Sequence, residues 1–256
     1  MLDLSNKKYL VVGIANEKSI AWGIAQSLHQ AGAQLAFTFL NEALEKRVRP
    51  LAEEVGCKLV LKCDVQNDDE LVSVAGSIKE AWGSLDGIVH AVAFAERADL
   101  QGRFIETSRS GFYTALDVSA FSLIALVREL RGLLAVKGGS VLTLSYLGSN
   151  RVVDNYKVMG VAKAALESAV RYIASDVGSE GIRVNCISAG PIKTLAASGI
   201  PKFREMLAHV AERSPLKRNV SQEDIGRAAL YFLSELSAAV TGEVHYVDCG
   251  YNFVGL

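Results

Sequence analysis

The chain has 256 residues and a formal net charge of −1; half of its residues are hydrophobic and 21% are charged. This balance is typical of a well-packed globular enzyme, and it gives no electrostatic reason to expect binding to nucleic acid or to an anionic membrane. No stretch approaches the roughly 18 consecutive apolar residues that membrane insertion needs, and the N-terminus has no signal-peptide pattern.

Short apolar runs alternate with longer helical stretches along the whole chain. The runs are β-branched and lack strict alternation, as expected of strands buried on both faces. They cover residues 9–12, 34–39, 58–62, 87–91, 140–144, 183–187 and 244–247, and helical spacing marks 20–31, 68–82, 119–134 and 156–177. The order predicts an α/β fold over residues 1–256: a single-domain, Rossmann-like, doubly wound parallel sheet of about seven strands with helices on both faces.

The first predicted strand leads into Gly13 and a turn that ends at Ser19 and Ile20, where a helix is expected to begin. A dinucleotide pyrophosphate needs close backbone approach and free N–H groups at a helix start, which this turn can supply. Gly23, one helical turn further on, is expected to let the helix pack closely on the strand. The spacing is a variant of the usual G-x-G-x-x-G, and a strand–turn–helix without ligand is the alternative.

The next two strands end in residues that face the expected cofactor edge. Leu40 and Asn41 follow the second strand, without the acidic residue that holds an adenosine ribose or an arginine that receives a 2′-phosphate. The choice between NADH and NADPH is therefore only weakly encoded. Asp64 and Val65 follow the third strand, and Asp64 could accept a hydrogen bond from an adenine amino group. Capping of the following helix by Asp64 is the alternative.

Segments after the later strands can form a pocket at the same edge, because doubly wound sheets bind ligands at the carboxyl ends of their strands. Small residues at 91–95 leave room for a flat ring or an acyl chain, and Tyr146 follows the fifth strand. After the sixth strand, a glycine-proline turn leads into 192–196, a loop suited to closing over a cofactor, in which Thr194 offers a hydroxyl. We expect a substrate lid over approximately 192–213; a short surface helix is the alternative.

Tyr156 and Lys163 are the most informative pair in the chain. Seven residues turn an α-helix by about 700°, so both side chains would leave one face, roughly 10 Å apart along the axis. A phenol can donate a hydrogen bond to a developing oxyanion, and an ammonium can hold hydroxyls of a ligand. If nothing else in the sequence were considered, the pair would be interpreted as a surface tyrosine and a surface lysine on an amphipathic helix.

The cysteines and histidines predict no metal site. The four cysteines have no C-x-x-C spacing, and the four histidines form no H-E-x-x-H or comparable cluster. Three of the cysteines lie in or beside strand-like runs, where a buried thiol is the ordinary explanation. A reducing cytoplasm fits this pattern.

Together these motifs resemble the short-chain dehydrogenase/reductase superfamily and, within it, the bacterial enoyl-acyl-carrier-protein reductases of the NADH type. The resemblance covers essentially the whole chain and is carried by Gly13-x5-Ser19-Ile20, LTLSYLG at 142–148, Tyr156-x6-Lys163 and ISAGPIKTLAASGI at 187–200. Superfamily members that reduce ketones use Y-x3-K, whereas here Gly160 stands at the fourth position after the tyrosine. That difference favours reduction of a carbon–carbon double bond.

The resemblance implies a cytoplasmic homotetramer of type II fatty acid synthesis. It would transfer hydride from NADH, with NADPH as the alternative, to the β-carbon of a trans-2-enoyl thioester on acyl-carrier protein. The implied catalytic residues are Tyr156, Lys163 and Tyr146. The implied cofactor-binding residues are Gly13, Ser19, Ile20, Leu40, Asp64, Val65, Val92, Lys163, Ile192, Lys193, Thr194, Leu195 and Ala196. The implied substrate-binding residues are Ala95, Tyr146, Tyr156, Met159, Ile200, Phe203 and Met206.

Three positions depart from the family's pattern. Leu40 stands where a glutamine is common near the adenosine ribose, and Ala93 replaces a frequent glycine beside the nicotinamide. Cys249 replaces a usual glycine but is expected to lie away from the chemistry. Two other functions are weighed against this one: a related short-chain reductase acting on enoyl-CoA or β-ketoacyl substrates, and a catalytically silent dinucleotide-binding sensor.

Overall fold

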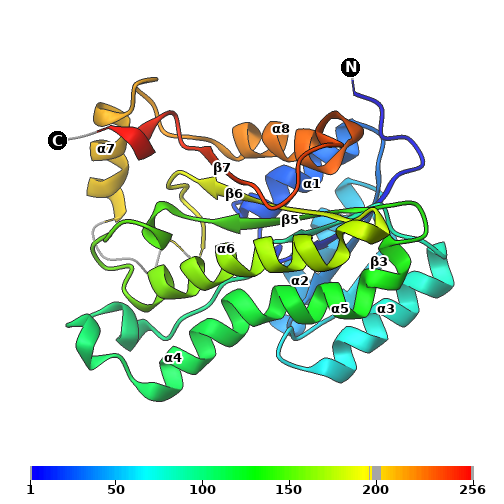
Figure 1. Ribbon diagram of the computed structural model, residues 1–256, viewed down its shortest axis with the longest axis horizontal. Coiled ribbons are helices and arrows are strands. Elements are labelled where there is room, and N and C mark those ends of the chain that lie inside the picture. The colour runs from blue at the N-terminus through cyan, green and yellow to red at the C-terminus, as the bar shows by residue number, and fades with distance from the viewer. Residues whose placement is uncertain (1, 196, 198–202, 255–256) are drawn as a thin grey trace.

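The computed structural model describes residues 2–195, 197 and 203–254, and a parallel sheet of seven strands lies at its centre (Figure 1). The strand order is β3-β2-β1-β4-β5-β6-β7. The strands are β1 (Lys8–Val12), β2 (Gln34–Phe39), β3 (Leu59–Lys62), β4 (Gly87–His90), β5 (Ser140–Ser145), β6 (Arg183–Ala189) and β7 (Val244–Val247). The predicted doubly wound α/β fold is confirmed, and the predicted strand boundaries agree to within two residues.

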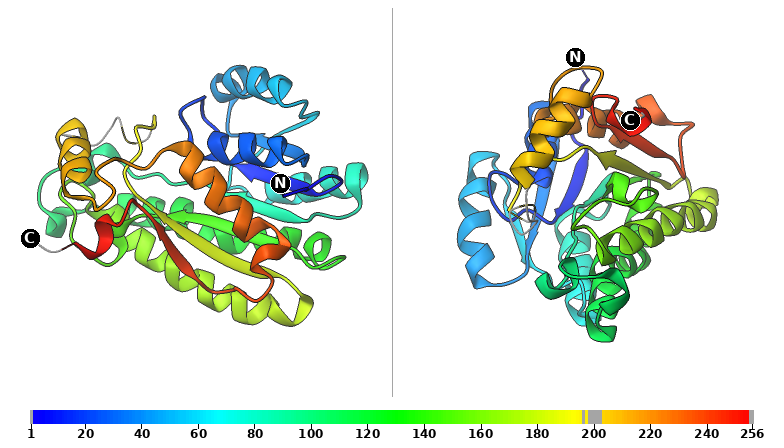
Figure 2. Two further views of the ribbon diagram at one scale, coloured as in Figure 1. Left: turned by 90° about the horizontal axis from the view of Figure 1, so that it is seen from above. Right: turned by 90° about the vertical axis from the view of Figure 1, so that its left-hand side faces the viewer.

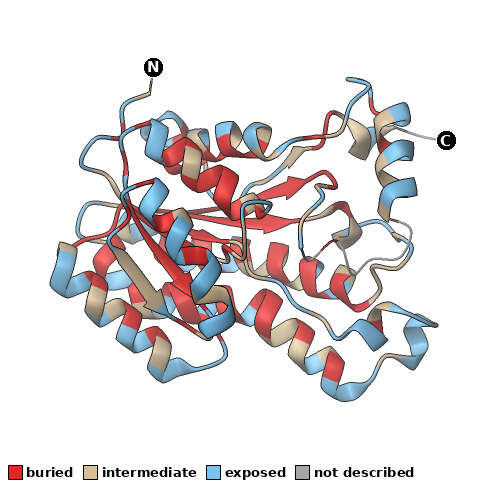
Figure 3. Ribbon diagram, turned by 180° about the vertical axis from the view of Figure 1, so that it is seen from behind, coloured by how far each residue is buried: buried red, intermediate tan, exposed pale blue. Residues whose placement is uncertain are grey.

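Helices cover both faces of this sheet. They are α1 (Ile20–Gln30), α2 (Glu42–Glu54), α3 (Asp68–Trp82), α4 (Arg109–Leu116), α5 (Ser122–Leu134), α6 (Val158–Val177), α7 (Phe203–Arg213) and α8 (Gln222–Leu233). The helices α1, α2 and α8 pack into the core on one face, and α3, α5 and α6 into the core on the other. Figure 2 shows α8 lying beside α1, and Figure 3 shows the buried sides of the helices turned toward the sheet.

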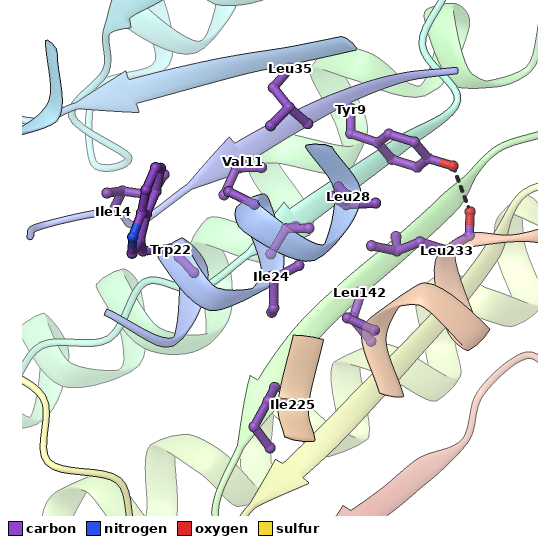
Figure 4. Packing of buried hydrophobic residues seen from close by; sticks show 14 of the residues in the cluster. Tyr9, Val11, Ile14, Trp22, Ile24, Leu28, Leu35, Leu142, Ile225 and Leu233 are labelled. Atoms are coloured by element: carbon purple, nitrogen blue, oxygen red, sulfur yellow. Dashed lines mark hydrogen bonds between the residues drawn. The ribbon is translucent and has the colours of Figure 1, made fainter. Parts of the chain in front are cut away.

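The central strand β1 explains why the sequence lacks strict alternation. Tyr9 and Val11 point into one core while Leu10 and Val12 point into the other, so these four consecutive positions are all buried. The Tyr9 hydroxyl remains satisfied because it donates a hydrogen bond of 2.8 Å to the Leu233 carbonyl at the end of α8 (Figure 4). This bond ties the first strand to the last long helix.

Two helices differ from their predicted ranges. The helix predicted at 119–134 is the second part of a longer run, Arg109–Leu134, in which α4 passes into α5 through a π-helical turn at Asp117–Phe121. By length and composition this run could cross a membrane, but 56% of its most apolar window is buried within the molecule, as in a core helix. The other helix, predicted from residue 156, begins at Val158, and this difference moves Tyr156 off the helix.

The strand order reverses between β1 and β4, and Gly13 lies at this position, directly after β1. Its φ of 111° lies in a region that favours glycine, and a Cβ there would come within 2.3 Å of the Ala91 carbonyl oxygen. The ends of β1 and β4 therefore lie too close together for a side chain at residue 13. This is the crevice in which doubly wound sheets bind their ligands.

A buried histidine lies next to this crevice, at the end of β4. His90 is 1% exposed; its Nε2 lies 2.8 Å from the Ser122 hydroxyl and its Nδ1 lies 2.9 Å from the Thr143 hydroxyl. The Ser122 hydroxyl donates to the Val118 carbonyl, and the Thr143 hydroxyl donates to the His90 carbonyl at 3.2 Å. Burial, followed by the Lys163 ammonium, lowers the pKa of His90 to about 3, so the ring is neutral.

Candidate active site

Hydrogen bonds to the Ser19 side chain stabilise the turn after β1. The Ser19 hydroxyl oxygen accepts hydrogen bonds from the backbone N–H groups of Ala15 and Asn16, at 3.0 and 3.1 Å. Ser19 therefore shapes the turn, while α1 begins at Ile20 with first-turn N–H groups that have no partner within the helix. Together with the close approach at Gly13, this arrangement fits a dinucleotide pyrophosphate.

The prediction that Gly23 lets α1 pack closely on the strand is wrong. A Cβ at this position would come within 2.7 Å of the Gln222 side chain, so the glycine allows α1 to pack against the start of α8 rather than on the strand. The Gln222 amide also donates to the Ser19 carbonyl at 2.6 Å. The turn after β1 is thus held in place by a helix from the far end of the chain.

The residues after β2 and β3 lie at the edge where the adenosine half of a dinucleotide would extend. The Asp64 carboxylate accepts a hydrogen bond from the Gln66 N–H at 3.0 Å, and the Asp64 N–H donates to the Glu70 carboxylate. The helix that follows is capped by Asn67, so the capping alternative for Asp64 is wrong. Val65 is buried in the core, and Leu40 is 44% exposed.

After β4 the chain runs past the half-buried Val92 and is then fixed by one serine. The fully buried Ser119 hydroxyl bonds both the N–H and the carbonyl of Phe94, at 3.0 and 3.2 Å. Beyond it, the half-buried Ala95 and Tyr156 pack against a buried apolar cluster that contains Met159. Three of the predicted substrate-binding residues therefore form one small apolar cluster.

The two predicted active-site tyrosines touch. The rings of Tyr146 and Tyr156 pack edge to face with centroids 4.8 Å apart. Burial, followed by the nearby Tyr251, raises the pKa of Tyr146 to about 12. Burial also raises the pKa of Tyr156 well above its usual range, with smaller effects from Tyr146 and Glu167. Both phenols are therefore protonated at neutral pH and can act as hydrogen-bond donors.

Tyr156 lies in a turn before α6, so the prediction that it and Lys163 share a helical face is wrong. The residues on either side, Asn155 and Lys157, have φ values of 60° and 45°, a region that L-residues seldom adopt. The Lys157 ammonium fixes the turn by donating to the Gly102 carbonyl at 2.6 Å. Strained backbone of this kind is typical of functional sites, and here it presents the phenol.

Lys163 does lie on α6, on the side that faces the sheet. It is 6% exposed, and its ammonium donates a hydrogen bond of 2.7 Å to the Leu144 carbonyl at the end of β5. Burial is the main cause that lowers its pKa to about 8, with Cys186 and Glu167 acting in the opposite direction. The side chain therefore ends at the carboxyl edge of the sheet and is mostly protonated at neutral pH.

The loop after β6 and the helix α7 complete the described part of the site. Ile192 packs on the same core as Ile20, Lys193 and Leu195 are exposed, and the Thr194 hydroxyl accepts a hydrogen bond from the Ala197 N–H. On α7, Phe203 and Met206 are half-buried, and the Tyr146 hydroxyl donates to the Met206 sulfur at 3.5 Å. The predicted Ala196 and Ile200 lie outside the described residues.

A pocket of about 620 Å³ opens beside Tyr146. The turn before α6, helix α7 and the C-terminal turn form its walls, which include Met206, His209 and Tyr251. Another hollow of about 600 Å³ lies on the outer side of α4, α5 and α6, and neither Tyr146 nor Tyr156 lines it. The pocket beside Tyr146 is the candidate active site, because Tyr146 lines it and the ring of Tyr156 packs against Tyr146.

Sequence reasoning missed two polar residues behind the site. Ser145, the last residue of β5, donates a hydrogen bond of 2.5 Å to the carboxylate of Glu167, and both are buried. A signal was present in the sequence: Glu167 follows Lys163 by four residues, on a helix whose sheet-facing positions are otherwise apolar.

The fold and these residues define a dinucleotide-binding oxidoreductase of the short-chain type. The family model described as "Enoyl-(Acyl carrier protein) reductase" matches residues 13–252. The chain belongs to this family.

Relatives and solved structures agree along the full chain. "Enoyl-[acyl-carrier-protein] reductase [NADH] FabI" of Rickettsia typhi is 53% identical over 98% of this chain and 96% of its own length. The Bacillus cereus protein of that name is 51% identical over 98% and 99%. The crystal structure of the Bacillus cereus reductase with NADP+ and indole naphthyridinone superposes with a TM-score of 0.97, at 51% identity over 100% of both chains. The Anaplasma phagocytophilum reductase in complex with NAD gives 0.95, at 47% identity over 99% and 96%.

These matches confirm the expected family, the expected fold and the expected NADH-dependent enoyl reductase function.

Proposed function

We propose that Tyr156 is the residue that stabilises the transition state when this enzyme reduces a trans-2-enoyl thioester carried on acyl-carrier protein. The observation that carries this assignment is the contact between two half-buried, protonated phenols, Tyr146 and Tyr156, the first of which lines a pocket at the carboxyl edge of the sheet. NADH, when bound, supplies the hydride for the β-carbon of the substrate. Negative charge then accumulates on the thioester oxygen, where a donor stabilises the transition state more than the ground state.

Tyr156 suits this role because it can donate a hydrogen bond without losing its proton. Its raised pKa makes full proton transfer costly, whereas an enolate oxygen needs only a hydrogen bond. A ketone reductase must instead protonate an alkoxide. Solvent then supplies the proton at the α-carbon. Tyr146, in contact with the Tyr156 ring, positions the substrate and the second phenol.

The cofactor is held along the carboxyl edge of the sheet. Gly13, Ser19 and Ile20 support the pyrophosphate, and the Lys163 ammonium holds the nicotinamide ribose. Their support is the close backbone approach at Gly13, the helix start at Ile20, and the placement of Lys163 at the end of β5. The remaining predicted cofactor residues lie after β2, β3, β4 and β6, namely Leu40, Asp64, Val65, Val92, Ile192, Lys193, Thr194, Leu195 and Ala196.

The acyl chain lies between the apolar cluster of Ala95 and Met159 and the helix α7. Contact between the Tyr146 hydroxyl and Met206 supports α7 as part of a substrate lid over approximately 192–213, within a single catalytic domain. Phe203, on the first turn of that helix, and Ile200 complete the proposed lining. A carrier-bound substrate would enter beside this lid.

A homotetramer in the cytoplasm is the proposed working form. Large apolar side chains are exposed on the outer side of α4, α5 and α6; among them Tyr113 is 59% exposed and Tyr172 is 73% exposed. A groove between these helices offers a second copy of the chain a surface to bury. All four cysteines are free and buried, which supports a reducing compartment.

The test is oxidation of NADH, and separately of NADPH, with crotonyl and longer trans-2-enoyl thioesters on acyl-carrier protein and on CoA. Acetoacetyl thioester is the control substrate. We expect oxidation that depends on the enoyl group, and NADH ahead of NADPH because no basic residue directly follows β2. Reduction of the β-ketoacyl thioester, or cofactor binding without turnover, would contradict the proposal.

A further inference from the structure

Helix α6 carries two charged residues on its buried side. Lys163 and Glu167 lie one helical turn apart, 6% and 9% exposed, among sheet-facing residues that are otherwise apolar. Charged side chains are rarely buried to this extent unless other groups compensate them. The sequence therefore places a cation and an anion together where packing alone would favour two apolar side chains.

Adjacent residues at the end of β5 hold the two charges. The Leu144 carbonyl accepts a hydrogen bond of 2.7 Å from the Lys163 ammonium, and the Ser145 hydroxyl donates one of 2.5 Å to the Glu167 carboxylate. The next residue along the chain is Tyr146. The two bonds therefore fix α6 to the strand end that leads directly into the active-site tyrosine.

Glu167 is the negative charge that acts on Lys163. Three further titratable groups interact with this pair: His90 from β4, Cys186 from β6 and Tyr156 from the turn before α6. All three are neutral at pH 7, because burial lowers the pKa of His90 to about 3 and raises the pKa values of Cys186 and Tyr156. Burial lowers the pKa of Lys163 to about 8, and Cys186 and then Glu167 oppose that shift. Because the Cys186 thiol is neutral at pH 7, Glu167 is the group that can supply the opposing charge.

We propose that Glu167, held by the Ser145 hydroxyl, is a positioning residue that keeps the Lys163 side chain charged at the cofactor site. The inference rests on the role proposed above for Lys163 in holding the nicotinamide ribose. Without the carboxylate, the desolvated ammonium loses its compensating charge and releases its proton at a lower pH. The enzyme would then lose affinity for NADH within the physiological pH range.

The experiment measures the dissociation constant of NADH by fluorescence titration between pH 6 and pH 10. The key variant is Glu167→Gln, because its amide oxygen still accepts the Ser145 hydrogen bond and only the charge is removed. We expect the midpoint at which affinity falls to move to lower pH by about one unit. At the acidic end of the titration the variant should bind NADH as the wild type does, which a purely structural defect would not allow.

Two serine variants on β5 separate the proposed role from loss of stability. Ser145→Ala should shift the midpoint in the same direction by a smaller amount, because Glu167 loses its hydrogen bond. Ser140→Ala is the matched control: Ser140 is buried on the same strand and donates to the Phe232 carbonyl, remote from the site. It should lower the melting temperature without moving the midpoint.

An unshifted midpoint in Glu167→Gln, or an affinity lost equally at every pH, would overturn the inference. If Glu167→Gln does not fold, the Ser145→Ala titration decides in its place, and an unshifted midpoint there overturns the inference as well. Lys163→Met separates the role of Lys163 from that of Glu167. Unchanged NADH affinity in Lys163→Met would refute the role of Lys163 itself, whereas weakened affinity beside an unshifted Glu167→Gln midpoint would refute the role of Glu167 alone.

Discussion

Acid should destabilise this fold through His90. The ring is 1% exposed, and its native pKa of about 3 lies below its ordinary value of 6.5. Below pH 6.5 the unfolded chain binds a proton that the native state does not bind until about pH 3. Stability is therefore complete above pH 6.5 and is lost as the pH falls toward 3.

The expected loss follows from the interval between these two pKa values. At about 1.4 kcal/mol per pH unit, the interval from 6.5 to about 3 corresponds to about 5 kcal/mol, of which about 2 kcal/mol is lost by pH 5. Urea unfolding at pH 7 and pH 5, at one protein concentration, gives the change in unfolding free energy directly.

His90→Gln tests whether this residue causes the loss. Glutamine cannot titrate, although it can still reach the hydroxyls of Ser122 and Thr143. The variant should lose about 2 kcal/mol less than the wild type between pH 7 and pH 5. His29→Gln, in an exposed histidine at the end of α1, is the control and should behave as the wild type. Equal pH dependence in His90→Gln and the wild type would refute the reasoning.

Three further predictions concern the site. Tyr156→Phe should lower kcat by about 10² to 10³-fold, with little change in the dissociation constant of NADH, because the variant lacks a donor to the developing charge. Steady-state kinetics and a fluorescence titration of NADH measure the two quantities. Weakened NADH binding with a normal kcat would contradict the prediction. Lys163→Ala should weaken NADH binding by about 10 to 100-fold, because a charged hydrogen bond is lost; an unchanged dissociation constant would count against the assigned role. Gly13→Ala should lower the free energy of unfolding by about 2 to 3 kcal/mol and abolish cofactor binding, because the new Cβ would meet the Ala91 carbonyl and the backbone φ is positive. A variant with normal melting temperature and NADH affinity would show that the crevice tolerates a side chain.

The strands were predictable because burial on both faces of the sheet requires a continuous run of apolar residues in each strand. Tyr9 to Val12 are apolar without alternation, and this follows directly from the two cores that they separate. Because the strands are parallel, their carboxyl ends share one edge of the sheet, and Tyr146 and the Lys163 ammonium both lie at that edge. Local pattern and fold therefore agreed wherever a residue's neighbours along the chain determined its environment.

Predictions failed where a distant segment or an unusual backbone conformation decided the outcome. Tyr156 was placed on the helix because helical periodicity extends to it, yet the positive φ values of Asn155 and Lys157 interrupt the helix there. Gly23 was assigned to the wrong contact because its partner, Gln222, comes from the far end of the chain. The role of Ser145 as the partner of Glu167 likewise depends on the pairing of α6 with β5, which one sequence does not reveal.

The contact of α8 with the turn after β1 has a consequence for synthesis on the ribosome. The hydrogen bond from Gln222 to Ser19 joins residues 203 positions apart, and the crevice beside Gly13 also needs β4. An emerging chain therefore exposes the apolar side of α1 until nearly all of it has been translated. We expect nascent chains that end before α8 to be held by chaperones and to bind no nucleotide, so that cofactor capture comes late in the assembly of the enzyme.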